Sequence, residues 1–115
     1  MDVSDALAVQ SLVAQIEAEH GPLTGVIHSA GVIRDSFLIK KTAQELQDVF
    51  APKVAGLIAL DEATKDCKLE QFIVFSSGAG VLGNVGQADY AAANALMDAY
   101  ASYRQELVER GQRRG

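Results

Sequence analysis

Apolar residues in the first twenty positions recur at the spacing of one helical face. Ser4 precedes them and can cap the N-terminus of a helix, while His20-Gly21-Pro22 follows them and favours its end. Apolar positions at i, i+3, i+4 and i+7 predict a helix that buries one side. The stripe consists of Val9, Leu12, Val13 and Ile16.

Two short apolar runs show no alternation with polar residues. Gly25-Val26-Ile27 is one, and the stretch from Gln71 to Ser76, rich in Phe, Ile and Val, is the other. Unalternating runs of this length are typical of strands that helices cover on both faces. The first run is followed by His28-Ser29-Ala30-Gly31, which predicts a turn of small residues.

Two further helical patterns lie between and after these strands. Thr42-Ala43-Gln44-Glu45 has the spacing of a capping box, so it predicts the start of a helix. Pro52 lacks an N–H and therefore either kinks this helix or begins a new one over 52–65. An alanine-rich segment predicts a long helix over 88–109.

The order helix, strand, helix, strand, helix predicts an α/β fold with right-handed parallel crossovers. Two strands are too few for a stable open sheet with helices on both faces. We therefore expect the chain to be a section of a larger domain, with exposed sheet edges or contacts to a partner.

Composition excludes several classes of protein. The 115 residues carry 15 acidic and 10 basic side chains, a net charge of −5, which argues against broad binding to nucleic acid or to an anionic membrane. No apolar run reaches the roughly 20 residues of a membrane span. The start lacks a basic signal region, and the single cysteine, Cys67, fits a reducing compartment, so we expect a cytoplasmic protein. The histidines and the cysteine show no metal-ligand spacing.

A glycine motif follows the second predicted strand. Gly78-Ala79-Gly80-Val81-Leu82-Gly83 spells G-x-G-x-x-G, the fingerprint of a dinucleotide-binding turn. The predicted helix begins several residues too late, however, and no second strand ending in an acidic residue follows. The motif therefore favours a flexible loop beside a site over a phosphate-binding loop.

Tyr90 and Asn94 form a Tyr-x-x-x-Asn pattern, and Lys53 lies upstream in another predicted helix. Four stretches surround these residues and Ser77: Gly25 to Val32, Ala51 to Val54, Phe75 to Ser77 and Gly86 to Ala95. Together they resemble the ketoreductase domains of modular polyketide synthases, a branch of the short-chain dehydrogenase/reductase superfamily. Ordinary superfamily members carry Tyr-x-x-x-Lys, whereas this branch carries Tyr-x-x-x-Asn and takes its lysine from an earlier helix.

The resemblance implies a fold and an activity for the parent protein. The fold is part of a Rossmann-like doubly wound parallel sheet with flanking helices, and 1–115 is the central to C-terminal section of one catalytic domain. The upstream phosphate loop, the final strands and the lid are absent from this section. The activity is NADPH-dependent reduction of a β-ketoacyl thioester, carried on acyl carrier protein, within a larger synthase.

The same resemblance assigns roles to individual residues. The catalytic set is Tyr90, Ser77, Lys53 and Asn94. Asp2 and Val3 match the strand end that contacts the adenine of the cofactor. The residues that match the lining of the nicotinamide ribose are His28, Ser29, Ala30 and Gly31.

Elementary chemistry agrees with these roles. Reduction of a ketone by hydride needs a proton donor at the oxygen, and a tyrosine, with an ordinary pKa of about 10, is a weak acid unless positive charge stabilises its phenolate. Lys53 can supply that charge. Ser77 can hydrogen-bond the same oxygen, and Asn94, one helical turn after Tyr90, can position the lysine or a relay water.

Each of these residues also has a plain structural reading. Taken alone, Tyr90 reads as a core tyrosine, Lys53 as a solvated lysine and Ser77 as a strand-end cap. Asn94 alone reads as a polar helix residue that needs a partner, and His28 as a turn histidine. Only the joint occurrence at the family's spacing favours the catalytic interpretation.

Asp35 is the candidate for stereochemical control. Ile33-Arg34-Asp35 stands where the family has a Leu-Asp-Asp marker and keeps its second aspartate, and Leu82 stands where a marker tryptophan would be. This combination resembles the B-type, which implies a D-configured β-hydroxyl. The alternative is that Asp35 only caps the turn after Gly31.

Three functional hypotheses remain open at this point. The first is the ketoreductase section, expected to be inactive as an isolated chain. The second is a non-catalytic folded remnant or association module of a synthase, and self-association is expected because a two-strand core leaves apolar surface uncovered. The third is another superfamily reductase that acts on a free small molecule, which the lysine–asparagine exchange disfavours.

Overall fold

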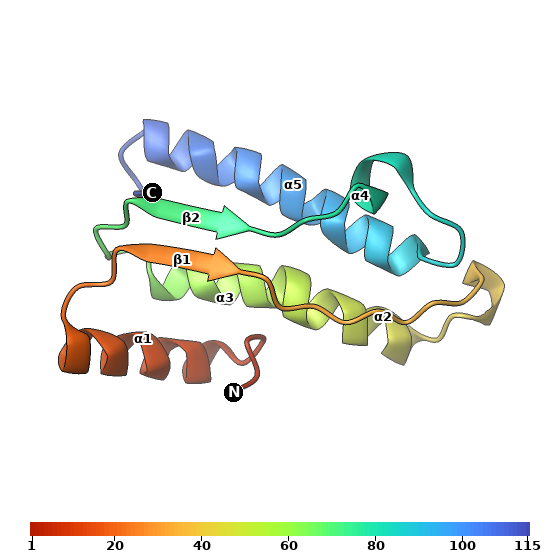
Figure 1. Ribbon diagram of the computed structural model, residues 1–115, viewed down its shortest axis with the longest axis horizontal. Coiled ribbons are helices and arrows are strands. Elements are labelled where there is room, and N and C mark those ends of the chain that lie inside the picture. The colour runs from red at the N-terminus through yellow and green to blue at the C-terminus, as the bar shows by residue number, and fades with distance from the viewer.

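The computed structural model describes residues 1–115 and arranges them as helices packed on a small sheet (Figure 1). The shortest dimension is 16 Å, which accommodates one sheet and one layer of helices. The elements in chain order are α1 (Ala6–His20), β1 (Gly25–His28), the 3-10 turn η1 (Leu38–Lys40), α2 (Ala43–Phe50), the π-helical turn η2 (Ala51–Ala55), α3 (Gly56–Ala63), β2 (Gln71–Val74), α4 (Ala79–Leu82) and α5 (Ala88–Glu109).

The two strands lie side by side and run in the same direction (Figure 1). Gly25 pairs with Gln71 and His28 pairs with Val74, which confirms the parallel arrangement predicted from the order of elements. Both strands therefore end at the same end of the sheet. Open α/β sheets bind their ligands beyond the carboxyl ends of the strands, so this end is where a site is expected.

Helices cover one face of the sheet. Val26 and His28 of β1 are buried, whereas Ile27 between them is 61% exposed. Ile73 of β2 is exposed in the same way. The expectation that helices cover both faces of each strand is therefore wrong within these residues. The runs are apolar on both sides, but the helices of this chain contact one another in a single layer.

Asp5 rather than Ser4 caps α1. The Asp5 carboxylate accepts a hydrogen bond from the Ala8 N–H at 3.1 Å, while the Ser4 hydroxyl donates to Asp2. Serine and aspartate are both favourable N-cap residues, and the choice between them moves the start of the helix by one residue. The expected end is confirmed, because Gly21 takes a positive φ of 89° directly after His20.

One helical run extends from α2 through η2 to α3. The predicted capping box at Thr42 and Glu45 is confirmed, since each side chain bonds the backbone N–H of the other. Pro52 lies at the start of η2, where the backbone stays in the right-handed helical region. The missing N–H therefore widens one turn to π geometry instead of ending the helix.

The glycine motif after β2 forms a short helix, α4, where a flexible loop was expected. α4 packs against α5. A Cβ atom at Gly80 would lie 2.9 Å from the Ala95 backbone nitrogen, so only glycine allows this approach. The motif thus serves the packing of two helices.

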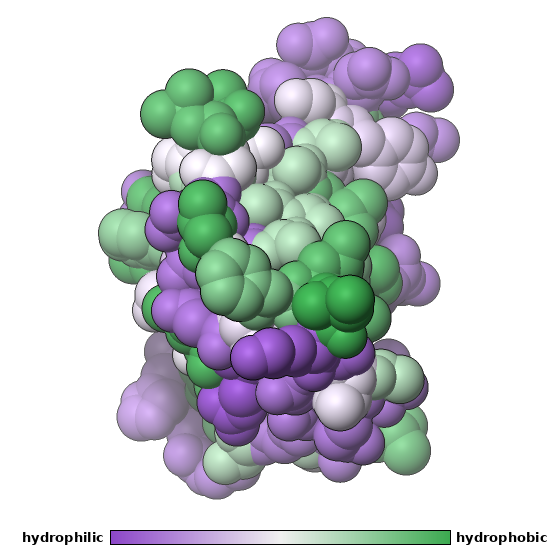
Figure 2. Space-filling view, turned by 90° about the vertical axis from the view of Figure 1, so that its right-hand side faces the viewer, coloured by the Kyte–Doolittle hydropathy of each residue, from purple (hydrophilic) through white to green (hydrophobic).

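Exposed apolar side chains gather at the end of the molecule beyond the carboxyl ends of the strands (Figure 2). We call this surface the apolar end. Its residues are between 62% and 93% exposed, and they come from the segment around η1, from α4 and from the segment that follows α4. They are Phe37, Leu38, Ile39, Val81, Leu82 and Val85.

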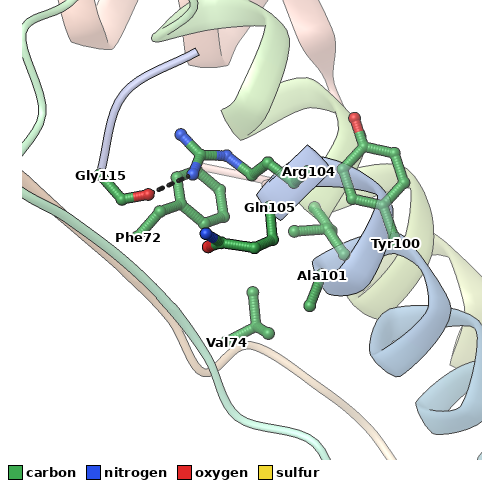
Figure 3. A pocket seen from close by; sticks show the side chains of 8 residues that line it. Phe72, Val74, Tyr100, Ala101, Arg104, Gln105 and Gly115 are labelled. Atoms are coloured by element: carbon green, nitrogen blue, oxygen red, sulfur yellow. Dashed lines mark hydrogen bonds between the residues drawn. The ribbon is translucent and has the colours of Figure 1, made fainter. Parts of the chain in front are cut away.

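The opposite end of α5 holds a buried charge cluster. Asp61, fully buried, accepts hydrogen bonds from the Tyr100 hydroxyl at 2.7 Å, from Arg104 Nε at 2.8 Å and from Arg113 Nε at 3.1 Å. Arg104 also donates to the carbonyl oxygen of Gly115 beside a cavity of about 60 Å³ (Figure 3). No predicted site residue lines this cavity, so we assign the cluster a structural role.

Candidate active site

Lys53 lies against the ring of Tyr90. Its ammonium nitrogen Nζ is 5.2 Å from the ring centroid, within the range of a cation–π contact. Lys53 is only 5% exposed, so water screens its charge weakly. η2 and the first turn of α5 therefore bring together the two residues that the sequence proposes as charge and proton donor.

Three contacts fix the position of the Lys53 side chain. Nζ donates a hydrogen bond to the Phe75 carbonyl oxygen at 3.3 Å and lies 4.0 Å from the Met97 sulfur. A Cβ atom at Gly31 would lie 3.0 Å from Lys53 Cε, so the glycine leaves room for the lysine stem. An ammonium has three donors, and the contacts with Phe75 and Met97 leave one of them without a partner in the chain.

His28 contacts the backbone of η2, the turn that carries Lys53. Its Nε2 lies 3.2 Å from the Lys53 carbonyl oxygen, and the residue is 2% exposed. Burial lowers the pKa of the His28 imidazole. His28 is therefore neutral at neutral pH, and because its partner is a carbonyl, Nε2 carries the proton and donates.

Asn94 lies one helical turn after Tyr90 and is fully buried. Its Nδ2 donates to the Tyr90 carbonyl oxygen at 2.7 Å, while its Oδ1 is buried without a partner. The Ser76 hydroxyl donates to the Asn94 carbonyl oxygen at 3.2 Å, which attaches the end of β2 to this turn. A buried acceptor without a partner is costly, so Oδ1 is suited to accept a hydrogen bond from water or from a ligand.

Ser77 lies between β2 and α4. Its hydroxyl oxygen accepts a hydrogen bond from the Ala79 N–H at 3.3 Å. Because the oxygen accepts this bond, the hydroxyl proton remains free to donate to a substrate oxygen. The position after the end of β2 agrees with the predicted role, which stays a prediction.

The residues proposed for cofactor contact meet at the carboxyl end of β1. Gly56 links them, since a Cβ atom there would lie 2.8 Å from Val3 and 3.4 Å from His28. A polar hollow of about 330 Å³ extends from Asp2 to Arg34. Hydrogen bonds from Ser4 lower the pKa of the Asp2 carboxyl, which favours its charged form.

The cofactor contacts differ in what each residue can offer. The His28 side chain faces the core, so any contact that it makes with a cofactor uses its backbone. Ser29, Ala30 and Gly31 are exposed and leave the strand end open. Asp35 is also exposed, in the segment between β1 and η1.

Several residues that shape the site were not singled out from the sequence. Met97 and Ser76 touch Lys53 and Asn94, but a methionine in a helix and a serine after a strand carry no distinctive signal. Gly80 belongs to the G-x-G-x-x-G motif, which is typical of dinucleotide binding. The need for glycine at this position comes from its close approach to the backbone at Asn94, which the sequence does not show.

Comparison with known families identifies the family of this chain. The family model described as KR domain matches residues 1–112. The chain belongs to the KR domain family. Two relatives from Bacillus subtilis (strain 168) align over 114 residues, which is 99% of the chain: polyketide synthase PksN is 53% identical and polyketide synthase PksL is 54% identical. The aligned part is 2% of each relative.

Solved structures give the same result. A ketoreductase domain from the bacillaene assembly line is 53% identical, with a TM-score of 0.96 over 99% of this chain and 27% of that one. A short chain dehydrogenase from Mycobacterium avium is 27% identical, with a TM-score of 0.76 over 82% of this chain and 36% of that one. The predicted fold class, part of a Rossmann-like parallel sheet, is confirmed.

Membership in the KR domain family confirms the resemblance seen in the sequence. The chain spans about a quarter of the solved ketoreductase chain that it matches. No helix combines the length and the apolar character needed to cross a membrane. The location in the cytoplasm stays a prediction.

Proposed function

We propose that residues 1–115 are the central to C-terminal section of a ketoreductase catalytic domain. In the complete synthase this domain reduces a β-ketoacyl thioester on acyl carrier protein to the β-hydroxyacyl form. The observation that carries the proposal is the contact of the buried Lys53 with the half-buried Tyr90 ring, 5.2 Å from Nζ to the centroid, at the carboxyl end of a parallel sheet.

NADPH is the proposed cofactor, and the residues at the strand ends fit a nicotinamide nucleotide. Asp2 borders the polar hollow, Gly31 leaves an uncovered backbone over Lys53, and Asn94 Oδ1 is a buried acceptor without a partner. When bound, the cofactor supplies the hydride for the carbonyl carbon. Every other part of the chemistry falls to side chains of the protein.

The proton is proposed to come from the Tyr90 hydroxyl. As the carbonyl oxygen gains negative charge, the hydroxyl gives it a proton, and the Lys53 ammonium stabilises the phenolate that remains. The Ser77 hydroxyl donates a hydrogen bond to the same oxygen. Asn94 Oδ1 holds the water that returns a proton to Tyr90.

The apolar end fits an acyl substrate. Its residues lie at the end of the molecule toward which both strands point, in the segment around η1 and in and after α4 (Figure 2). Carbon chains lose contact with water on such a surface. Asp35 lies in the first of these segments, which supports the proposed B-type control and a D-configured hydroxyl.

Replacing Tyr90 in the intact ketoreductase domain tests the proposal. Tyr90→Phe is expected to lower turnover of a β-ketoacyl thioester by at least about 100-fold, the scale of general acid catalysis. Tyr103→Phe is the matched control, because Tyr103 is 52% exposed and lies on the same helix more than three turns after Tyr90. Equal turnover in both variants would refute the assignment.

The second candidate function is a non-catalytic association module. The open face of the sheet favours it, since Ile27 and Phe75 are 61% and 58% exposed. This reading predicts that the 115-residue chain self-associates, whether or not the complete domain is active. Sedimentation showing a folded monomer at high concentration would contradict it.

A further inference from the structure

A second buried contact joins the two helices of the proposed site. Lys41 Nζ lies 3.1 Å from Asp89 Oδ2, and each side chain is 1% exposed. Oδ2 has no hydrogen-bond partner, so the contact is an attraction of charges without hydrogen-bond alignment. Neither residue belongs to the set that the chemistry uses.

Each member of this ion pair is attached to a residue of the site. Lys41 directly precedes Thr42, the cap of α2, and that helical run continues to Lys53. Asp89 directly precedes Tyr90, and its Oδ1 accepts the Tyr90 N–H at 2.8 Å. The ion pair therefore connects the helical run that carries the lysine to the start of the helix that carries the tyrosine.

The ion pair also fastens the segment that contains Asp35. Lys41 Nζ donates to the Arg34 carbonyl oxygen, one residue before Asp35. The Ser36 N–H donates to the Gly86 carbonyl oxygen at 2.9 Å, one residue after Asp35. Both attachments lead to the turn that opens α5, so the segment is held at two points.

A buried ion pair is a poor device for stability alone. Taking two charges out of water costs about as much as their attraction returns, and apolar side chains of similar volume often stabilise as well or better. What the charges add is a defined geometry, because a carboxylate without its partner is strongly unfavourable there. That geometry is most useful where the distance between two helices must be kept.

We infer that Lys41 and Asp89 are positioning residues for reduction: their ion pair fixes Tyr90 relative to Lys53 and holds the Asp35 segment beside it. This inference rests on the proposed function. The pair thereby affects both the rate of proton transfer and the face of the carbonyl that is presented. Neither residue touches the reacting atoms.

Three variants of the intact domain test the inference: Asp89→Asn, Lys41→Met and the double variant. Asp89→Asn keeps a side-chain acceptor for the Tyr90 N–H, and the double variant leaves no unpaired buried charge. All three are expected to lower kcat per folded molecule about tenfold or more, the scale for misplaced reacting groups, with a small change in KM. The fraction of D-configured product is expected to fall in all three.

The double variant separates positioning from stability. It is expected to unfold at about the parental urea concentration, yet to keep the lowered kcat and the mixed product. Parental kcat and parental product ratio in the folded double variant would overturn the inference. That result would mean that the ion pair does not position the residues of the site.

Asp61→Asn is the matched control, because it also alters a buried ion pair to α5, that of Asp61 on α3 with Arg104 on α5. It is expected to lower stability while leaving kcat per folded molecule and product ratio unchanged. If Asp61→Asn lowers kcat and the fraction of D-configured product as much as Asp89→Asn does, then loss of any buried ion pair to α5 has this effect and the inference is wrong. Tyr90→Phe tests the proposed function separately, since its full activity would refute that function whatever the other variants show.

Discussion

Gly80 lets α4 lie directly against the backbone of α5, and its replacement by alanine tests how tightly this contact fixes the site. A Cβ atom at position 80 would lie 2.9 Å from the Ala95 nitrogen and 3.0 Å from the Asn94 carbonyl carbon. Both are backbone atoms, so no side chain can rotate away. One of the two helices must move.

Two opposing effects set the free energy of unfolding of Gly80→Ala. Alanine stabilises a helix by about 1 kcal/mol relative to glycine, whereas overpacking costs about 1–3 kcal/mol. The net expectation is a loss of up to about 2 kcal/mol. The movement falls on the turn of Asn94, which bonds Tyr90, so turnover is expected to fall about tenfold or more.

Gly78→Ala provides the control for this measurement. A Cβ atom at Gly78 meets nothing within 4 Å, and the residue has a φ of −55° that alanine adopts freely. Urea denaturation and steady-state turnover of the intact domain are compared for both variants. Equal stability and equal turnover would show that α4 does not constrain the site.

Two further predictions concern the charge and the cofactor. Lys53→Met keeps the aliphatic stem but removes the positive charge that favours the phenolate, so the pH–rate profile of the intact domain is expected to move to higher pH; an unmoved profile would contradict the role of Lys53. The isolated 115-residue chain is expected to bind NADPH weakly or not at all, because it contains no Thr-Gly-rich phosphate loop; calorimetric titration with micromolar affinity would contradict this.

Local patterns predicted most of the elements. The alanine-rich segment forms α5 over Ala88–Glu109, as expected, and the capping box begins α2. These features depend on neighbours within one or two turns, which the sequence displays directly. The parallel pairing followed from the order of elements.

Features that depend on distant neighbours could not be predicted in this way. α4 forms because Gly80 lets it pack on α5, and its own four residues give no helical signal. The open face of the sheet depends on which helices the chain supplies. Ser4 and Asp5 are adjacent candidates for the N-cap of α1, and the choice between them moves the start of the helix by one residue. The three-dimensional packing decides which of them caps the helix.

Some contacts of the candidate site could be predicted from the sequence, and others could not. The Tyr90 and Lys53 assignments came from a resemblance, and the structure brings the two side chains together. The ion pair of Lys41 with Asp89 could not be predicted from the sequence, because a lysine before a helix and an aspartate at a helix start are ordinary surface residues. Their burial depends on the fold of both segments.

Single-turnover reduction tests the central claim, that Tyr90 donates the proton, most directly. The intact domain is saturated with NADPH and mixed rapidly with β-ketoacyl thioester, for the parent and for Tyr90→Phe. If NADPH affinity is unchanged and the observed rate constant falls at least about 100-fold, the hydroxyl acts in the chemical step. A single-turnover rate constant close to that of the parent would contradict the account.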